Sequence, residues 1–205
     1  MKASRVILIA MVLVLGIIFY YSLSRGTSEE DYTALIQKER RGKDDLMKSS
    51  DESPLGDERN SFTGLKYYEP NPRYRIRASL SPIPNKKVVT LPTSAGEETR
   101  YLEYAWATFD LDEVENKLLL LEVMDMGPQR GKLFLAFADA TSALETYGAG
   151  RYLDVKKIPA ASSIELDFNK AYNPYCAYVD RYSCPIPPKE NILRVAIRAG
   201  EKSYK

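Results

Sequence analysis

An uninterrupted apolar segment, Val6 to Leu23, lies near the start of this chain, and water is a poor solvent for it. As an α-helix this segment would be about 27 Å long, close to the ~30 Å hydrocarbon core of a bilayer. Lys2 and Arg5 precede it and acidic residues 29–31 follow it, a charge distribution that places the N-terminus in the cytoplasm. We therefore predict that residues 1–24 are a single-pass anchor whose partner is the lipid bilayer, contacted through residues 6–23.

A cleaved signal sequence is the alternative interpretation of the same segment. Ser22 and Ser24 are small residues with the spacing that signal peptidase uses, but the apolar run exceeds the usual length of a signal-peptide core. Both interpretations place the remaining residues outside the cytoplasm, in the cell envelope. We favour the uncleaved anchor and a cell-membrane location.

Residues 25–60 are polar and predict a short helix followed by a linker. Ser28 and Asp31 resemble a capping box, which favours a helix of about four turns within residues 27–47. This helix would either dock loosely or serve as a spacer above the membrane. Residues 49–60 contain Ser, Asp, Pro and Gly, and they predict an irregular linker or an anchoring loop.

From Ser61 onward the chain alternates between short apolar segments and turns that contain Pro and Gly. In residues 74–80 the apolar side chains alternate with Arg75 and Arg77, the period-two pattern of a half-buried strand. Further strands are predicted at 87–91, 100–111, 117–124, 132–137, 151–155, 163–168 and 191–199, with turns at 112–116 and 127–131. Because no helical pattern separates them, we predict a mainly β domain over residues 61–205, folded as an antiparallel barrel or sandwich.

The composition excludes several classes of function. The 205 residues contain no histidine, so Ser-His-Asp and Cys-His nucleophile pairs and histidine-ligated metals are excluded. The net charge is +1 and no basic cluster is present, so no nucleic-acid partner is expected. We expect no cofactor and no metal, and any catalysis would depend on carboxylates, Tyr, Lys or Cys.

Residues 139–191 are the least regular part of the predicted domain and are rich in tyrosine. Long irregular segments in compact domains are usually functional or are held by special interactions. The tyrosine rings could form a stacking platform for sugars or other planar ligands. We favour the alternative, in which the rings line a core and their hydroxyl groups lie at its rim.

Six short motifs of the β-rich part belong together. They are Phe62-Thr-Gly-Leu-Lys-Tyr-Tyr68, Phe137-x-Asp139-x-Thr141, Gly150-Arg-Tyr-Leu-Asp154, Asp167-Phe-Asn-x-Ala-Tyr-Asn-Pro-Tyr-Cys176, Cys184-Pro-x-Pro-Pro-x-Glu-Asn191 and Ala199-Gly-Glu201. With them, residues from about 62 to 204 resemble a prokaryotic family catalogued as domain of unknown function 1684, whose members include secreted and membrane-attached proteins. The resemblance implies a shared fold and placement, and it transfers no activity.

The candidate site residues come from these motifs: Asp139, Arg151, Tyr152, Asp154, Asp167, Asn169, Tyr172, Asn173, Tyr175, Glu190, Asn191 and Glu201. Two carboxylates in one cleft could perform acid–base chemistry if their pKa values differ, or several could bind a hard cation. We favour a structural interpretation, in which caps, Asx-turns and one Arg–carboxylate pair hold long loops together. The asparagines suit bonds to the backbone.

Cys176 and Cys184 are the only two cysteines. Outside the cytoplasm such a pair predicts a disulfide, which would stabilise the domain by roughly 2.5 kcal/mol. A reactive cysteine would lack a histidine partner, a metal site would lack soft ligands, and a redox pair would lack the Cys-x-x-Cys spacing.

Two hypotheses for the function follow. The first is a non-enzymatic envelope module that binds a small molecule, polymer or protein through residues 139–191. The second is a histidine-independent hydrolase that uses paired Asp and Glu carboxylates in the same region. An enzyme should bring two of these carboxylates within ~5–10 Å at a cleft, whereas a binding module should present aromatic rings on a groove. We favour the binding module.

Overall fold

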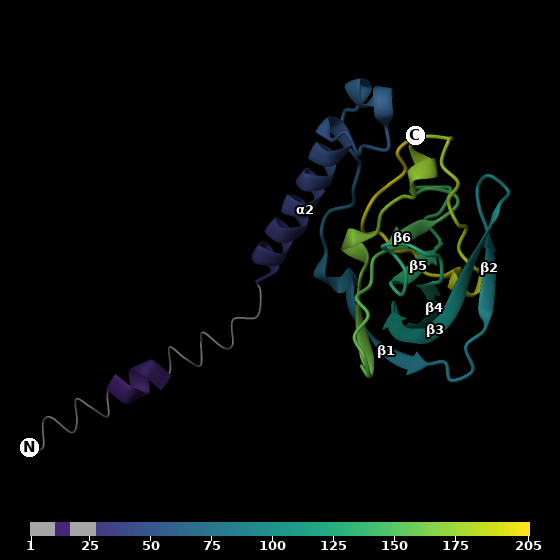
Figure 1. Cartoon of the computed structure of the whole chain (residues 1–205). Helices are drawn as coiled ribbons and strands as arrows, with labels where there is room; N and C mark the ends of the chain where they lie inside the picture. Colours follow the sequence, from purple (N-terminus) through teal and green to yellow (C-terminus); the bar gives the residue numbers. More distant parts are fainter. Residues whose placement is uncertain (1–10, 17–27) are drawn as a thin grey trace, which may run out of the picture. The chain divides into compact units, whose positions relative to one another are not determined.

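The structure is a computed structural model that describes residues 11–16 and 28–205 (Figure 1). Internal contacts divide the chain into two units, residues 1–35 and 36–205. Most of the predicted span 6–23 lies outside the described residues, which include its helical residues 11–16. Within the described ranges, no helix combines the length and the apolar character needed to cross a bilayer.

Helix α2, Glu29–Ser49, is longer than the four turns that the sequence predicts. The Ser28 hydroxyl accepts a hydrogen bond from the Asp31 amide at 3.1 Å, which confirms the expected cap. Charged residues interrupt the apolar pattern of the helix without ending it, because Glu, Lys and Arg have high helix propensities. The second half of α2 belongs to the larger unit, in which Ile36 and Met47 are buried.

The segment that follows α2 is an anchoring loop, one of the two alternatives that the sequence left open. Leu55 is buried in a cluster with Met47, Phe62 and Tyr178. The Ser53 hydroxyl donates a hydrogen bond to the Met47 carbonyl at 2.5 Å. A 3₁₀ turn, Gly56–Ser61, completes the loop and leads into the β domain.

The larger unit is built on one antiparallel sheet that curves into a half-barrel, which confirms the mainly β class. The spatial order of its strands is β6-β5-β4-β3-β1-β7, with β2 also paired to β3. The strands are β1 (Arg75–Pro82), β2 (Val88–Pro92), β3 (Glu98–Leu111), β4 (Val114–Val123), β5 (Leu133–Phe137), β6 (Arg151–Leu153) and β7 (Ser163–Asp167). Short 3₁₀ turns lie at Pro72–Tyr74, Phe168–Lys170, Tyr175–Ala177 and Lys189–Asn191. The sequence predicted an antiparallel barrel or sandwich, and the described residues form a half-barrel sheet.

Strand β4 is buried on both faces, which explains the continuous apolar run in its sequence. Leu118 and Leu120 point into the main core, while Leu119 and Leu121 pack with Leu91 in a second cluster. Successive side chains of a strand point to opposite faces, so both faces of the sheet are covered at this position. The irregular segments that cover the sheet include most of the candidate site residues.

The turn between β3 and β4 is shorter than the predicted turn at 112–116. Asp112 and Glu113 alone form it, with φ values of 55° and 61°. Two consecutive residues with positive φ suit the tight hairpin turns that match the twist of antiparallel strands. Strand β4 therefore begins at Val114.

The predicted strand at residues 191–199 is wrong. This segment makes one isolated bridge, between Ile192 and Ala138, and otherwise follows an irregular path. The guanidinium of Arg151 donates hydrogen bonds to the carbonyls of Ile197 and Ala199. These carbonyls are therefore bonded to a side chain, and a strand partner is not needed to satisfy them.

Candidate functional site

Arg151, at the start of β6, is the largest fully buried side chain in the described residues. Its guanidinium pairs with the carboxylate of Asp139 at 2.8 Å, and neither side chain is exposed. It also donates to the carbonyl of Ile197 at 2.8 Å and to that of Ala199 at 2.5 Å. This pair joins the 139 loop, β6 and the C-terminal segment, as the structural interpretation of the motifs predicted.

Glu201 is a further buried charge, and three side chains donate hydrogen bonds to it. Its carboxylate accepts hydrogen bonds from Lys43 of helix α2 at 2.8 Å, from Tyr178 at 2.5 Å and from the side chain of Asn173 at 2.8 Å. The carboxylate is therefore saturated with donors and lies inside the protein. It fastens the second half of α2 to the β domain.

The remaining buried motif residues bond to the backbone. Asp167 accepts from the amide of Asn169 at 3.2 Å, and the Asn169 side chain accepts from the amide of Asn71 at 2.8 Å. Asn191 accepts from the Leu119 amide at 2.7 Å and donates to the Ala136 carbonyl at 2.8 Å. These residues hold loops against the sheet, as the sequence indicated for the asparagines.

Two motif glycines show how closely these loops approach the backbone. A Cβ atom on Gly150 would lie 2.5 Å from the Phe137 carbonyl oxygen, and one on Gly200 would lie 2.6 Å from that of Ala171. Both glycines also have positive φ, 89° and 76°. Only glycine fits these two positions, so the motifs that contain them are required by packing.

The other two candidate carboxylates, Asp154 and Glu190, are exposed. Each buried carboxylate has its own donors, so no pair of them is arranged to share a proton. In the described part of the chain, no group of three or more Cys, Asp or Glu residues could hold a metal ion. The buried polar motif residues thus form structural contacts, whereas other motif residues line the cavities of the candidate site.

The predicted disulfide is not formed: Cys176 and Cys184 are buried free thiols. The amide of Cys176 donates a hydrogen bond to Sγ of Cys184 at 3.2 Å. Burial, and next the neighbouring Cys176 thiol, raises the pKa of Cys184 to about 12. A neutral, hydrogen-bonded thiol is a poor nucleophile.

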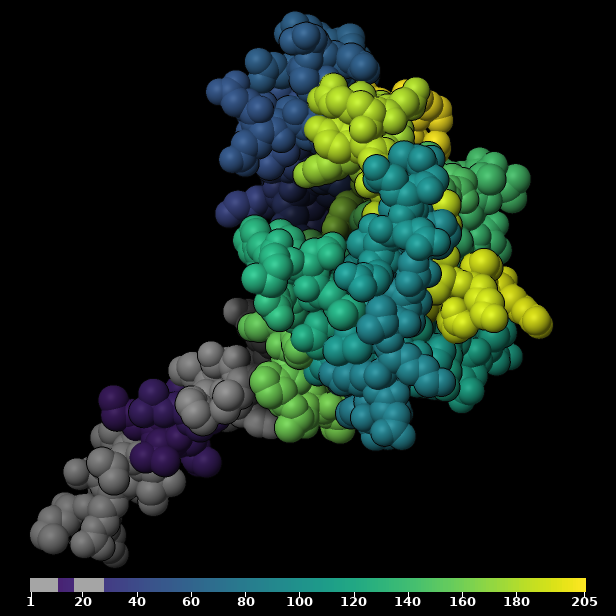
Figure 2. Space-filling model, turned by 45° about the vertical axis from the view of Figure 1, so that its right-hand side comes forward, coloured from purple at the N-terminus to yellow at the C-terminus, as the bar shows by residue number. Residues whose placement is uncertain are grey.

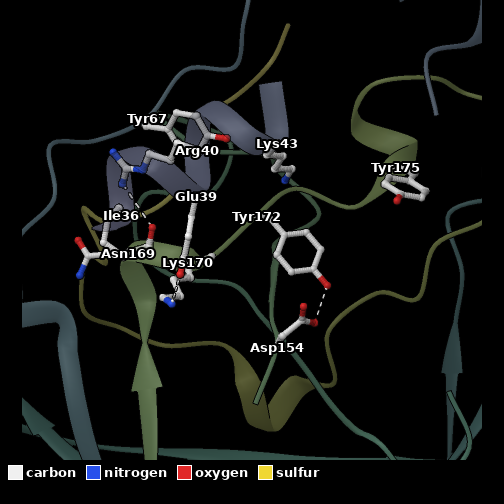
Figure 3. Close-up of a pocket in the computed structure, with 11 residues that line it drawn as sticks. Ile36, Glu39, Arg40, Lys43, Tyr67, Asp154, Asn169, Lys170, Tyr172 and Tyr175 are labelled. Carbon is white, nitrogen blue, oxygen red and sulfur yellow. Dashed lines mark hydrogen bonds and ion pairs between the residues drawn. The ribbon is translucent and has the colours of Figure 1, made fainter. Parts of the chain in front are cut away.

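One cavity, the helix-side pocket, lies between the second half of α2 and the segments around residues 154 and 169–175 (Figure 3). It has a volume of about 410 Å³, within the range of small-molecule sites. Its lining consists of Ile36, Glu39, Arg40, Lys43, Tyr67, Asp154, Asn169, Lys170, Ala171, Tyr172 and Tyr175. Of the predicted site residues, the structure therefore brings four together here: Asp154, Asn169, Tyr172 and Tyr175.

The charged groups of the helix-side pocket are held in defined positions. Lys43 lies over the ring of Tyr172, 4.8 Å from its centroid, while the Tyr172 hydroxyl donates to Asp154 at 2.9 Å. Lys170 pairs with Glu39 of α2 at 2.8 Å. Figure 3 shows Lys43 and Asp154 at opposite sides of the Tyr172 ring.

A second, larger cavity of about 1020 Å³, the tyrosine groove, adjoins the helix-side pocket. Asp154, Tyr172 and Tyr175 line both cavities. The aromatic residues of the groove are Tyr101, Phe134, Tyr152, Tyr172, Tyr175 and Tyr182. Figure 2 shows a hollow between the green segment near residue 130 and the yellow-green segment near residue 180, both of which contribute lining residues.

Four rings of the groove form a connected series in which each ring contacts the next: Tyr101, Phe134, Tyr152 and Tyr172. Phe134 stacks on Tyr101 with centroids 4.7 Å apart, and it meets the edge of Tyr152 at 5.0 Å. Tyr152 in turn contacts Tyr172 edge to face at 6.0 Å. Burial raises the pKa of Tyr101 to about 12, and burial raises the pKa values of Tyr152 and Tyr172 further. These hydroxyl groups remain protonated at neutral pH.

The helix wall of the pocket was not predicted from the sequence. Ile36, Arg40 and Lys43 line it from α2, whereas the sequence predicted this helix only as a loosely docked element or a spacer. Their spacing of four and seven residues places them on one helix face, and this signal was available in the sequence. Tyr101 and Phe134 were likewise predicted only as strand residues, and they were not included among the candidate site residues.

Comparison with known proteins identifies the family of this chain. The family model described as a protein of unknown function (DUF1684) matches residues 60–202. The chain belongs to the DUF1684 family. The resemblance that the motifs indicated is thereby confirmed. A comparison with curated proteins found no match.

A solved structure is similar to this DUF1684 protein. It is the solution NMR structure of an uncharacterized protein from Haloarcula marismortui, with 36% sequence identity and a TM-score of 0.63. The likeness covers 84% of this chain and 95% of that chain. Residues 60–205 are 146 of the 205 residues, or about 71%, so the likeness extends into residues before 60.

Proposed function

We propose that this protein is a non-enzymatic envelope module that binds a saccharide chain in the tyrosine groove. The observation that supports it is the connected series of aromatic rings along one cavity, from Tyr101 to Tyr172, with the Tyr175–Tyr182 pair lining the same cavity. Sugar rings have apolar faces and polar edges, and aromatic side chains offer the matching combination of flat surface and hydroxyl groups. The proposal includes an anchor at residues 6–23, which would place the groove outside the cytoplasm.

The charges of the groove favour a neutral ligand. Its lining contains Lys132, Lys156 and Lys157 together with Asp125 and Asp154. Lys157 pairs with Glu122 at 2.8 Å, so its charge is compensated within the protein. The positive and negative charges that line the groove are therefore close to balanced, and the lining lacks the excess of positive charge that a polyanion requires.

The hydrolase alternative has less support from the geometry. Asp139 and Glu201 are buried and saturated with donors from Arg151, Lys43 and Tyr178. A carboxylate pair that cleaves a glycosidic bond must face the substrate across a cleft. These two carboxylates face the interior of the protein.

The test is isothermal titration calorimetry of the full chain in detergent with neutral oligosaccharides derived from β-glucan, α-glucan and chitin. Tyr175, 45% exposed, is the most accessible ring of the groove. We expect saturable binding of one of these sugars, and we expect Tyr175→Ala to weaken it by up to about tenfold, since aromatic contacts contribute ~0.5–1.5 kcal/mol.

Tyr175→Phe is the matched control, because it keeps the ring and removes only the hydroxyl group. It should retain affinity within about twofold if stacking dominates. Absence of binding to every neutral oligosaccharide, or saturable binding of a proline-rich peptide in their place, would overturn the saccharide assignment.

A further inference from the structure

We propose that the helix-side pocket is a separate binding site for a free amino acid with an apolar or aromatic side chain. The pocket is distinct from the part of the groove lined by Tyr101, Phe134 and Tyr182, none of which contributes to it. Its volume of about 410 Å³ suits a ligand of this size. The proposal does not depend on saccharide binding in the groove.

One side of the pocket provides donors for a carboxylate. Lys43 is bonded to Glu201 at 2.8 Å and approaches the Tyr178 hydroxyl at 3.4 Å, so its ammonium group has a third N–H. Its side chain is 27% exposed and lines the cavity. Lys170, whose ammonium group makes one bond to Glu39, lines the same cavity. A ligand carboxylate beside either ammonium group would accept charge-assisted hydrogen bonds.

The other side provides an acceptor for an ammonium group. Asp154 is exposed, and the Tyr172 hydroxyl holds one of its oxygens at 2.9 Å. Among the residues from 28 to 205, no cation forms an ion pair with Asp154 within 4.0 Å. Its second oxygen is therefore available to an ammonium group that approaches through the pocket.

The space between these two sides suits an apolar body. Ile36 and Ala171 are each 1% exposed and form an apolar floor, and the rings of Tyr172 and Tyr175 flank it. Figure 3 shows Lys43 above the Tyr172 ring and Asp154 beyond its hydroxyl, so this ring lies between the Lys43 ammonium and the Asp154 carboxylate. A zwitterion with a flat side chain matches this arrangement, whereas a simple anion would leave the second oxygen of Asp154 unpaired.

The test compares three probes by calorimetry on the full chain in detergent. Phenylalanine carries both charges, phenylalaninamide lacks the carboxylate, and 3-phenylpropionate lacks the ammonium group. We expect phenylalanine to bind about ten- to a hundredfold more tightly than either derivative, because each charged hydrogen bond contributes a factor of this order.

Variants then assign the binding to this pocket. Asp154→Asn should weaken phenylalanine to the level of 3-phenylpropionate and leave 3-phenylpropionate within about twofold. Asp125→Asn is the matched control, because Asp125 lines only the groove. Equal affinity for phenylalanine and 3-phenylpropionate, no saturable binding of phenylalanine, or an unchanged Asp154→Asn variant would overturn the proposal.

Discussion

At the scale of single residues, Arg151 shows how a buried motif residue stabilises the fold of this protein. Its charge is enclosed by Asp139 and by carbonyls of the C-terminal segment, and its side chain is 0% exposed. A buried charge of this kind is stable only while every partner is present. The residue therefore fixes the position of the C-terminal segment, and it is not available to a ligand.

We predict that Arg151→Ala destabilises the domain by about 3–5 kcal/mol, because it leaves Asp139 buried without its partner. Urea denaturation followed by tyrosine fluorescence would measure the loss. Arg198→Ala is the control, because Arg198 pairs with Glu145 at the surface and should change stability by less than about 1 kcal/mol. A folded Arg151→Ala variant of wild-type stability would contradict the structural role.

The buried tyrosines predict a loss of stability at alkaline pH. Burial raises the pKa of Tyr101 from 10.0 to about 12, so between these values the unfolded chain releases a proton that the folded chain retains. The contribution of protonated Tyr101 to the free energy of unfolding is fully present below pH 10.0 and is lost as the pH rises toward 12. Tyr101→Phe should reduce the slope of unfolding free energy against pH in this window. Denaturation curves at several pH values would measure the slope, and an unchanged slope would contradict the assignment.

At the scale of elements, helix α2 is a wall of the pocket as well as a connection to the preceding residues. Its second half is held by an apolar contact at Met47 and by polar contacts at Glu39 and Lys43. The helix itself was predictable from its cap and its residue propensities. Its contacts were not, because they join α2 to residues more than a hundred positions away in the sequence.

We predict that Lys43→Met destabilises the domain by about 1–3 kcal/mol, because it leaves the buried Glu201 without its cation. Lys38→Met, on an exposed position of the same helix, is the control. Adding Glu201→Gln to Lys43→Met should restore part of the loss, since the charge is then removed as well. Thermal unfolding of Lys43→Met, Glu201→Gln and the double variant would test this coupling, and additive effects would contradict it.

At the scale of the whole molecule, the proposed placement determines which ligands the cavities can meet. An anchor at residues 6–23 with a cytoplasmic N-terminus would expose both cavities to the cell envelope. We predict that alkaline phosphatase fused after Lys205 is active in a bacterial host and that a cytoplasm-dependent fluorescent protein at the same position is dark. The reverse result would place the domain inside the cell and remove the envelope from the proposed function.

The sequence by itself determined the local features of this protein. Short apolar segments bounded by turn residues located seven strands to within a few residues, the Ser28 cap located the start of α2, and the absence of histidine excluded several chemistries. These features depend on neighbouring residues only, so they can be read from the order of the chain. The motifs also indicated the family, because their spacing is itself a property of the sequence.

The tertiary structure decided everything that depends on distant residues. It placed Arg151 against residues 197–199, which removed the strand predicted there, and it kept Cys176 and Cys184 as separate thiols. It left the sheet as an open half-barrel, because strand pairing and curvature arise from packing over both faces. The helix-side pocket likewise exists only because α2 and the segments around 154 and 172 meet in space, and the tyrosine groove only because the segments around 101, 134, 152 and 182 do. Hydrogen bonds and packing across such separations leave no periodic signal in a sequence, and for that reason the site required the folded chain.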